Sequence, residues 1–250
     1  MNDRASLLAF SALALTSTSS VAQQQKTTSV VLVHGAFVDG SGWQAVYDLL
    51  SNVGYEVLVV QNPTITLEGD VAATEAVIAA AKYPVTLVGH SYGGMVITQA
   101  GTNPKVKSLA YVAAFAPDAG ESAASLNEWP AEPGEAKAPL LPPQDGYLLV
   151  DPVKFPASFA ADSPEALTKF MAVAQVPWGL KAVEAKITKV GWKAKPSSFL
   201  IASQDRMITP SSQRKMAQRS GARTEEIKSS HAVMLSHPRE VAAFIESADR

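Results

Sequence analysis

The chain has 250 residues, and 47% of them are hydrophobic, which is enough for one domain with a large buried core. Charged residues make up 18%, the formal net charge is −2, and no block of lysine or arginine occurs, so the composition argues against a nucleic-acid or anionic-membrane partner. The absence of cysteine excludes disulfides, thiol nucleophiles and thiolate metal sites. The four histidines have no metal-ligand spacing, so we expect neither a metal nor a cofactor.

Residues 1–22 are predicted to be a secretory signal peptide, which implies a secreted or periplasmic protein. A short polar start, residues 1–4, precedes an apolar run at residues 5–15 that is too short to span a bilayer. Ser20 and Ala22 then place small residues at the −3 and −1 positions of a cleavage site. The alternative is a disordered or helical N-terminal extension. No later apolar run approaches the roughly 20 residues of a membrane-spanning helix, so no membrane span is expected.

Strands and helices alternate along the rest of the chain. Apolar runs predict strands at residues 29–33, 55–60, 85–88, 106–114, 198–202 and 223–227. Helical spacing predicts helices at residues 43–53, at 70–82 with Asp70 as its cap, at 91–100, at 211–219 and from 238 onward. This alternation predicts an α/β fold, a doubly wound and mostly parallel sheet covered by helices on both faces.

The alternation breaks between about residues 117 and 196, where the spacing becomes irregular and proline-rich. Aromatic and large apolar residues are scattered through this stretch, at Trp129, Phe155, Phe159, Phe170, Met171 and Trp178. We interpret it as an insertion that forms a helical cap over one end of the sheet, within a single domain of residues 23–250. Its aromatic residues suggest an apolar acyl or alcohol pocket, although they could equally form the cap's own core.

The sequence Gly89-His90-Ser91-Tyr92-Gly93 joins the apolar run V-T-L-V directly to the apolar run M-V-I-T-Q-A. A serine in so tight a turn between strand and helix has a strained backbone and a hydroxyl held above the sheet edge. The alternative is a glycine-rich turn that binds phosphate at a helix start, but no downstream lysine or acidic ribose partner supports it. The pattern therefore predicts that Ser91 is a nucleophile.

A serine hydroxyl needs a base, which should follow the last strand. His231 lies in the loop after that strand, whereas His237 precedes Pro238 and has the position of a helix cap, so His231 is the favoured base. His34 and His90 are interpreted as residues that shape their loops by hydrogen bonding.

A carboxylate must orient the base, and in chain order it should lie between the serine and the histidine. Asp205 is favoured because the end of its strand should neighbour the histidine loop; the alternative role for it is a turn-forming aspartate. Asp118, after an earlier strand, is the second choice. The remaining candidates lie inside the predicted cap: Asp145, Asp151 and Asp162.

An oxyanion hole needs two backbone N–H donors. Tyr92, the residue after the nucleophile, should supply one. The loop after the first strand, L-V-H-G-A-F, should supply the other, from Ala36 or, as second choice, Phe37. Gly35 would let this loop approach the serine closely.

The stretches H-G-A-F-V-D-G-S-G-W, G-H-S-Y-G-G, S-Q-D-R-M-I and S-H-A-V-M-L-S-H-P resemble the α/β-hydrolase superfamily over about residues 29–248. They are most similar to the branch that holds small plant-type esterases, hydroxynitrile lyases and their bacterial relatives. The resemblance implies the α/β-hydrolase fold and a triad of Ser91, Asp205 and His231. Lyases of this branch carry a threonine and a lysine where this chain has Gly35 and Ala232, and this departure favours ester hydrolysis.

The sequence therefore predicts an exported serine hydrolase whose partner is a small-molecule ester, small or medium in size. Two alternatives stay open. One is a hydroxynitrile lyase or another non-hydrolytic enzyme on the same fold, such as a cofactor-free oxygenase. The other is a ligand-binding protein with little turnover.

Overall fold

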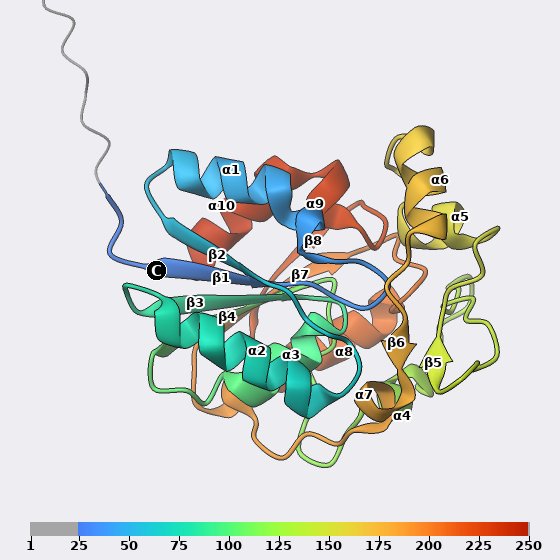
Figure 1. Cartoon of the computed structure of the whole chain (residues 1–250), viewed down its shortest axis with the longest axis horizontal. Coiled ribbons are helices and arrows are strands. Elements are labelled where there is room, and N and C mark those ends of the chain that lie inside the picture. Colours follow the sequence, from blue (N-terminus) through green and yellow to red (C-terminus); the bar gives the residue numbers. More distant parts are fainter. Residues whose placement is uncertain (1–24, 250) are drawn as a thin grey trace, which may run out of the picture.

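A computed structural model describes residues 25–249 of the chain. The predicted signal peptide, residues 1–22, lies outside the described residues. The main sheet has six parallel strands in the order β2-β1-β3-β4-β7-β8 (Figure 1). Its strands are β1 (Ser29–Val33), β2 (Glu56–Val60), β3 (Val85–His90), β4 (Val106–Val112), β7 (Ser197–Ala202) and β8 (Arg223–Ile227). The predicted doubly wound parallel sheet is thus confirmed.

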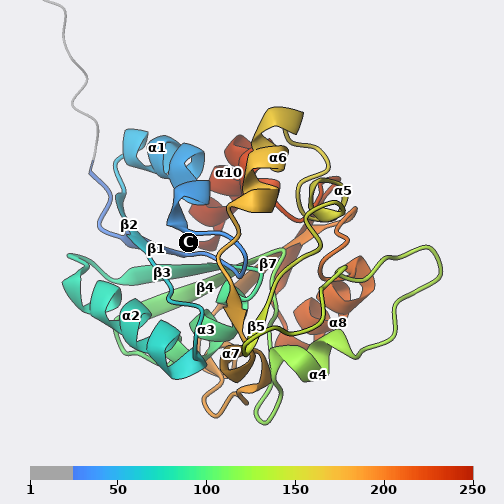
Figure 2. The same cartoon turned by 45° about the vertical axis from the view of Figure 1, so that its right-hand side comes forward.

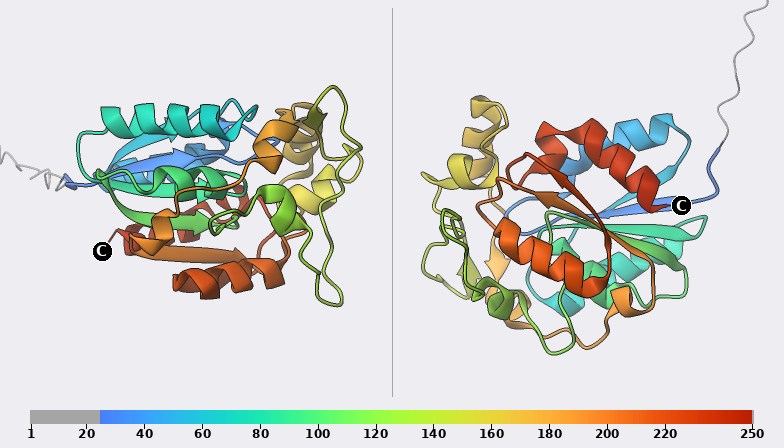
Figure 3. Two further views of the ribbon diagram at one scale, coloured as in Figure 1. Left: turned by 90° about the horizontal axis from the view of Figure 1, so that it is seen from below. Right: turned by 180° about the vertical axis from the view of Figure 1, so that it is seen from behind.

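Helices cover both faces of this sheet (Figures 1 and 3). On one side lie the 3-10 helix η1 (Gly40–Trp43), α1 (Gln44–Asn52), α9 (Val233–Ser236) and α10 (Pro238–Ala248). On the other side lie α2 (Leu67–Ala80), α3 (Gly93–Ala100) and α8 (Pro210–Ser220).

Each buried strand sends alternate side chains into two separate apolar cores, as the period of two in a strand requires. In β1, Val30 and Leu32 pack with Trp43 and the α1 and α10 side chains, whereas Val31 and Val33 pack toward α2, α3 and α8. Five consecutive apolar or small residues therefore stay fully buried in β1. The edge strand β8 is mostly exposed and carries charged residues, which discourage pairing with another chain.

Most of the segment between β4 and β7 lies over the carboxyl ends of the strands, and its last part runs back beside α3 (Figures 1 and 2). It contains α4 (Ala123–Asn127), β5 (Tyr147–Leu148), α5 (Phe155–Phe159), α6 (Glu165–Val173), β6 (Trp178–Gly179), α7 (Leu180–Glu184) and the 3-10 helix η2 (Gly191–Lys193). We call residues 117–196 the cap. Besides the predicted helices, the cap holds a two-stranded antiparallel sheet of β5 and β6, which the irregular sequence pattern did not indicate.

Several element boundaries differ from the prediction for local reasons. Helix α2 is capped by Thr66, whose hydroxyl accepts the Gly69 N–H, so Asp70 is not the cap as predicted but lies buried in the first turn. Strand β4 ends at Val112 because Ala113 has a positive φ of 44°. His237 does hold the cap position of α10, but its side chain makes no capping bond. Within the described residues, no helix combines the length and apolar character needed to cross a membrane.

Candidate active site

Ser91 occupies the turn between β3 and α3, in the left-handed region of backbone space with φ of 54°. A non-glycine residue in this region is uncommon, and it is held here by backbone bonds: the Ser91 N–H donates to Val112, and the Ser91 carbonyl accepts from Gly94 and Phe115. Because Ser91 cannot be helical, α3 starts at Gly93 rather than at Ser91. A Cβ atom on Gly93 would lie 2.6 Å from the Val33 carbonyl oxygen, so the turn requires glycine there.

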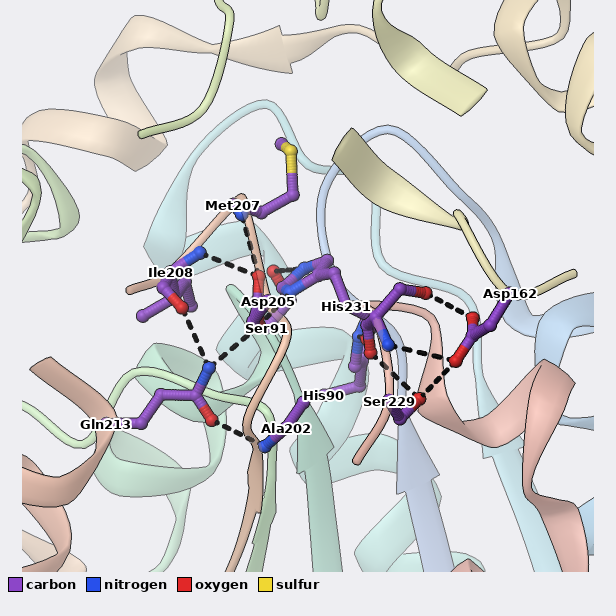
Figure 4. Close-up of polar contacts among 11 residues, drawn as sticks. His90, Ser91, Asp162, Ala202, Asp205, Met207, Ile208, Gln213, Ser229 and His231 are labelled. Carbon is purple, nitrogen blue, oxygen red and sulfur yellow. Dashed lines mark hydrogen bonds and ion pairs between the residues drawn. The ribbon is translucent and has the colours of Figure 1, made fainter. Parts of the chain in front are cut away.

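The structure brings Ser91, His231 and Asp205 together at the carboxyl ends of β3, β8 and β7 (Figure 4). The Ser91 Oγ–H donates to His231 Nε2 over 2.8 Å, and His231 Nδ1–H donates to Asp205 Oδ2 over 2.7 Å. The three residues are 8%, 0% and 2% exposed, so water competes little for these bonds. This is the geometry in which a base can take the serine proton while a carboxylate fixes the imidazole tautomer.

Asp205 accepts two further backbone bonds and one side-chain bond (Figure 4). Its Oδ1 accepts the N–H groups of Met207 and Ile208 at 2.7 and 3.0 Å, and its Oδ2 also accepts Gln213 Nε2 at 2.8 Å. Gln213 is itself tied to β7, because its Oε1 accepts the Ala202 N–H. Four donors around one side chain match the acceptor capacity of a carboxylate. No sequence signal marked Gln213, since a glutamine on an amphipathic helix has no motif of its own.

The alternative candidates lie elsewhere. Asp118 forms an ion pair with Lys193 and accepts the Ala119 N–H, and the Lys193 hydrogen bond lowers the pKa of its carboxyl. It has no contact with His231. The His237 imidazole bonds to the Ser236 hydroxyl and stays outside the Ser91 site.

The two expected oxyanion donors line the same small cavity as Ser91. Ala36 and Tyr92 are 2% and 0% exposed. Among residues 25–249, neither the Ala36 N–H nor the Tyr92 N–H donates a hydrogen bond to another protein group. Phe37, the second choice, also lines this cavity and has a positive φ of 67°. Free, water-shielded N–H groups beside a serine hydroxyl are the arrangement that stabilises a developing oxyanion.

Gly35 is the point at which the first loop touches the serine. A Cβ atom at this position would lie 2.6 Å from Ser91 Cβ and 3.0 Å from the His90 carbonyl oxygen, so any side chain must displace the loop or the serine.

Replacing Gly35 with alanine is therefore expected to lower kcat/KM for an activated ester by about 100-fold, because a displacement near 1 Å disturbs serine, base and oxyanion donor at once. Gly42→Ala is the matched control, since the nearest atom to its new Cβ is Met234 Cε at 3.9 Å. Steady-state kinetics on both variants test this, and equal activities would contradict the tight contact.

His34 and His90 bond to backbone groups of the site, as predicted. His34 Nδ1–H donates to the Gly35 carbonyl, and His34 Nε2 accepts the Asn62 N–H, both over 2.8 Å. His90 Nε2–H donates to the His231 carbonyl oxygen over 3.0 Å. Burial lowers the pKa of both imidazoles, strongly for His90, so both stay neutral and serve as fixed hydrogen-bonding groups.

Behind Tyr92 lies a buried carboxylate that the sequence did not reveal as part of the site. Asp70 Oδ2 accepts the Tyr92 hydroxyl over 2.6 Å, and Asp70 Oδ1 accepts the Thr64 N–H over 2.7 Å. Burial raises the pKa of Asp70 despite these two bonds. The residue expected to supply an oxyanion donor is thus anchored through its phenol.

The cavity above Ser91 is small and mainly apolar. Its volume is about 20 Å³, and its walls include Phe115, Leu140, Trp178 and Met207. Five of its wall residues also line an adjoining pocket of about 150 Å³: Asn127, Ala138, Leu140, Met207 and Ile208. A groove of about 460 Å³ between α6 and η1–α1 shares Phe37 with the Ser91 cavity. Residues 25–249 hold no cluster of three or more His, Cys, Asp or Glu residues that could bind a metal ion.

Asp162, rejected as the triad acid because it lies in the cap, nevertheless reaches the histidine loop. Its Oδ2 accepts the Ser229 hydroxyl and the Ser230 N–H, each over 2.9 Å, and its Oδ1 accepts the Ser230 hydroxyl (Figure 4). Burial alone would raise the pKa of Asp162, but the hydrogen bonds from Ser230 and Ser229 outweigh it and lower the pKa below the ordinary value of 3.8.

This lowered pKa predicts a pH-dependent contribution to folding. The carboxylate of Asp162 stabilises the folded chain fully above pH 3.8, and this contribution is lost as the pH falls through the lower folded-state pKa. Asp162→Asn should therefore lower the free energy of unfolding by about 1 kcal/mol near neutral pH, a modest value because solvent reaches the carboxylate. The difference from the parent should vanish in strong acid. Urea unfolding across this pH range measures it, and a pH-independent difference would contradict the assignment.

Comparison with known proteins identifies the family of this chain. Residues 30–244 match the family model described as the alpha/beta hydrolase family. A carbendazim hydrolyzing esterase from Nocardioides sp. (strain SG-4G) is 36% identical over 110 residues, which are 38% of this chain and 46% of that protein. The alpha/beta hydrolase nvfD of Aspergillus novofumigatus (strain IBT 16806) is 26% identical over 242 residues, 88% of this chain and 96% of that protein.

Solved structures with the same fold include two named hydrolases. A pyrethroid hydrolase from Sphingobium faniae JZ-2 superposes with a TM-score of 0.75 at 22% identity, covering 89% of this chain and 98% of that one. Polyneuridine aldehyde esterase superposes with a TM-score of 0.74 at 22% identity, covering 91% of this chain and 100% of that one. At these identities the likeness establishes the fold.

Proposed function

Because the chain belongs to the alpha/beta hydrolase family, we propose that it is a serine esterase that cleaves small or medium carboxylic esters through an acyl-enzyme. The observation that carries the proposal is the unbroken hydrogen-bond chain from Ser91 Oγ through the His231 imidazole to Asp205, set beneath a small, mainly apolar cavity. A serine so paired is activated for attack on a carbonyl carbon.

In the proposed reaction, Ser91 Oγ forms a bond to the ester carbonyl carbon while His231 Nε2 takes the hydroxyl proton. The Ala36 and Tyr92 N–H groups hold the resulting oxyanion. The bond to the alcohol oxygen then breaks, and His231 returns its proton to the leaving alcohol. A water molecule then gives a proton to His231 Nε2 and bonds to the acyl carbon. The bond between that carbon and Ser91 Oγ breaks, the acid leaves, and His231 returns its proton to Ser91 Oγ. Asp205 holds the imidazole and stabilises its protonated form throughout.

The sizes and walls of the cavities suit an ester in which at least one substituent is compact and apolar. The space above Ser91 holds little more than the reacting carbonyl, and the adjoining pocket of about 150 Å³ has Leu126 and Trp129 among its walls. The similar proteins are named as hydrolases: a carbendazim hydrolyzing esterase, a pyrethroid hydrolase and polyneuridine aldehyde esterase. Ester hydrolysis is the reaction that the Ser91 site could perform and that the two esterase names describe.

A substrate panel tests the proposal. Nitrophenyl esters of increasing acyl length, a lactone, an anilide, a carbamate and mandelonitrile should be assayed with the parent protein and with Ser91→Ala. We expect turnover of short and medium esters that depends on Ser91, and mandelonitrile cleavage near the uncatalysed rate. Gly35 and Ala232 favour ester hydrolysis over mandelonitrile cleavage. Gly35 lacks the threonine hydroxyl, and Ala232 lacks the lysine cation, that the lyases carry at these positions. Fast cyanide release without ester hydrolysis would overturn the proposal in favour of the lyase, and binding without turnover of any substrate would favour the ligand-binding alternative.

A further inference from the structure

The backbone around His231 is held on both sides by one short segment of the cap. Asp162, which lies between α5 and α6, accepts hydrogen bonds from Ser229 and Ser230 on the N-terminal side of His231 (Figure 4). On the C-terminal side, the Ala232 N–H donates to the Phe159 carbonyl oxygen over 2.9 Å. We call residues 159–162 the strap.

The strap also contacts the imidazole itself. The Phe159 ring is fully buried and meets the His231 ring edge-on, with the ring centroids 4.9 Å apart and an interplanar angle of 79°. Phe159 is fixed in turn by stacking on Phe155, with centroids 4.7 Å apart. One cap element thus limits both the position of the loop and the tilt of the imidazole.

These contacts differ from those of Asp205. Asp205 bonds to His231 Nδ1 and sets the tautomer and rotation of the ring, but it makes no bond to the loop backbone. Asp162 bonds the residues just before His231, and its Oδ2 lies 3.8 Å from the His237 imidazole nitrogen just beyond the same loop. Other bonds also hold the loop between β8 and α9. The His231 carbonyl oxygen accepts from His90, the Ser229 carbonyl oxygen accepts the Gln204 N–H, and the Ser229 hydroxyl bonds to Ser236.

We propose that Asp162 is a positioning residue for His231, through which the cap holds the catalytic base at the distance that proton transfer from Ser91 requires. This inference rests on the proposed function, in which His231 is that base. Proton transfer needs donor and acceptor within hydrogen-bond reach, and a displacement of about 1 Å can cost 100-fold in rate. A loosened loop should therefore slow the chemical step while leaving substrate binding nearly unchanged.

The test compares Asp162→Ala, Asp162→Asn and Ser230→Ala with a matched cap control, Asp151→Ala. Asp151 also accepts a backbone N–H, from Val153, and lies 3.7 Å from Lys154, but it makes no contact with the histidine loop. We expect Asp162→Ala to lower kcat by about 10- to 100-fold with KM within about threefold of the parent. Asp162→Asn, which keeps one acceptor oxygen, should lose less, and Asp151→Ala should keep the parental kcat.

A double-mutant cycle separates positioning from general support of the cap. The kcat losses of Asp162→Ala and Ser230→Ala should not add in the double variant, because the bond lost in Ser230→Ala is one of the three already lost in Asp162→Ala. Additive losses, or an Asp162→Ala variant that unfolds at a lower temperature but keeps the parental kcat, would overturn the proposal. If Asp162→Ala does not fold, Asp162→Asn and Ser230→Ala decide together: parental kcat in both refutes the strap, and a loss confined to kcat in either supports it.

A readout without turnover distinguishes this proposal from the proposed function. The proton shared by His231 Nδ1 and Asp205 should give a far-downfield proton NMR signal in the parent. Asp162→Ala should broaden or shift this signal through exchange with water, while Asp151→Ala leaves it unchanged. An unaltered signal in Asp162→Ala contradicts the strap even in an active esterase. An altered signal in a protein that hydrolyses no ester supports the strap and refutes only the proposed function.

Discussion

Replacing Ser91 with alanine is expected to lower kcat for an activated ester by about a millionfold, to a level near that of the oxyanion hole and binding alone. The alanine methyl group cannot form a covalent bond to the ester carbonyl carbon. His231 also has no serine hydroxyl to deprotonate. The fold should persist, because the Ser91 side chain makes a hydrogen bond only to His231 among the described residues and the turn is held by backbone bonds.

Steady-state hydrolysis of a nitrophenyl ester measures this loss, with circular dichroism to verify the fold. Ser51→Ala, on helix α1, is the matched control and should keep parental activity. A Ser91→Ala variant that retains more than about a tenth of the parental kcat would contradict the nucleophile assignment, because such retention is far above the residual rate of broken triads.

Replacing Asp205 with asparagine is expected to cost about 10⁴-fold in kcat. An amide nitrogen facing His231 Nδ1 would favour the tautomer with its proton on Nε2, and that tautomer cannot accept the Ser91 proton. The same amide has one acceptor oxygen, where the carboxylate now accepts bonds from Met207, Ile208, Gln213 and His231. The variant should also be less stable, by about 1–3 kcal/mol for the donors left unpaired.

Asp118→Asn is the matched control, since it removes a carboxylate that follows another strand and pairs with Lys193 on the surface. Its kcat should stay within about threefold of the parent, because the lost ion pair lies on the surface and contributes only about 0–1 kcal/mol to stability. Parallel kinetics on the two variants decide between the acids. A large loss in Asp118→Asn with little change in Asp205→Asn would place the acid at the earlier strand.

The core of the site could be predicted because a parallel sheet makes chain order informative. Strands β3, β7 and β8 all end at the same edge, so a residue just past each strand is brought to the others. The turn at Ser91 adds its own signal, since its strand, glycines and helix are contiguous in sequence. These local rules led to Ser91, Asp205 and His231 without knowledge of any contact.

Other parts of the site depend on contacts that no local rule encodes. Asp70 has the sequence position of a helix cap, but Thr66 takes that role and Asp70 turns inward to the Tyr92 phenol. Gln213 reaches Asp205 only because α8 packs beside β7. Asp162 belongs to the cap, whose prolines and irregular spacing give no periodicity from which its path could be traced. Tertiary packing decides all three positions.

Covalent labelling by diethyl nitrophenyl phosphate tests directly whether Ser91 is the nucleophile of a serine esterase. This organophosphate transfers its phosphoryl group to an activated serine, and water removes that group from the serine only slowly. We expect loss of esterase activity in step with a mass gain of one diethylphosphoryl group, located by peptide mapping on Ser91 and absent from Ser91→Ala. Inactivation with the label on another residue, or ester hydrolysis that continues unlabelled in excess reagent, would contradict a serine esterase acting through Ser91.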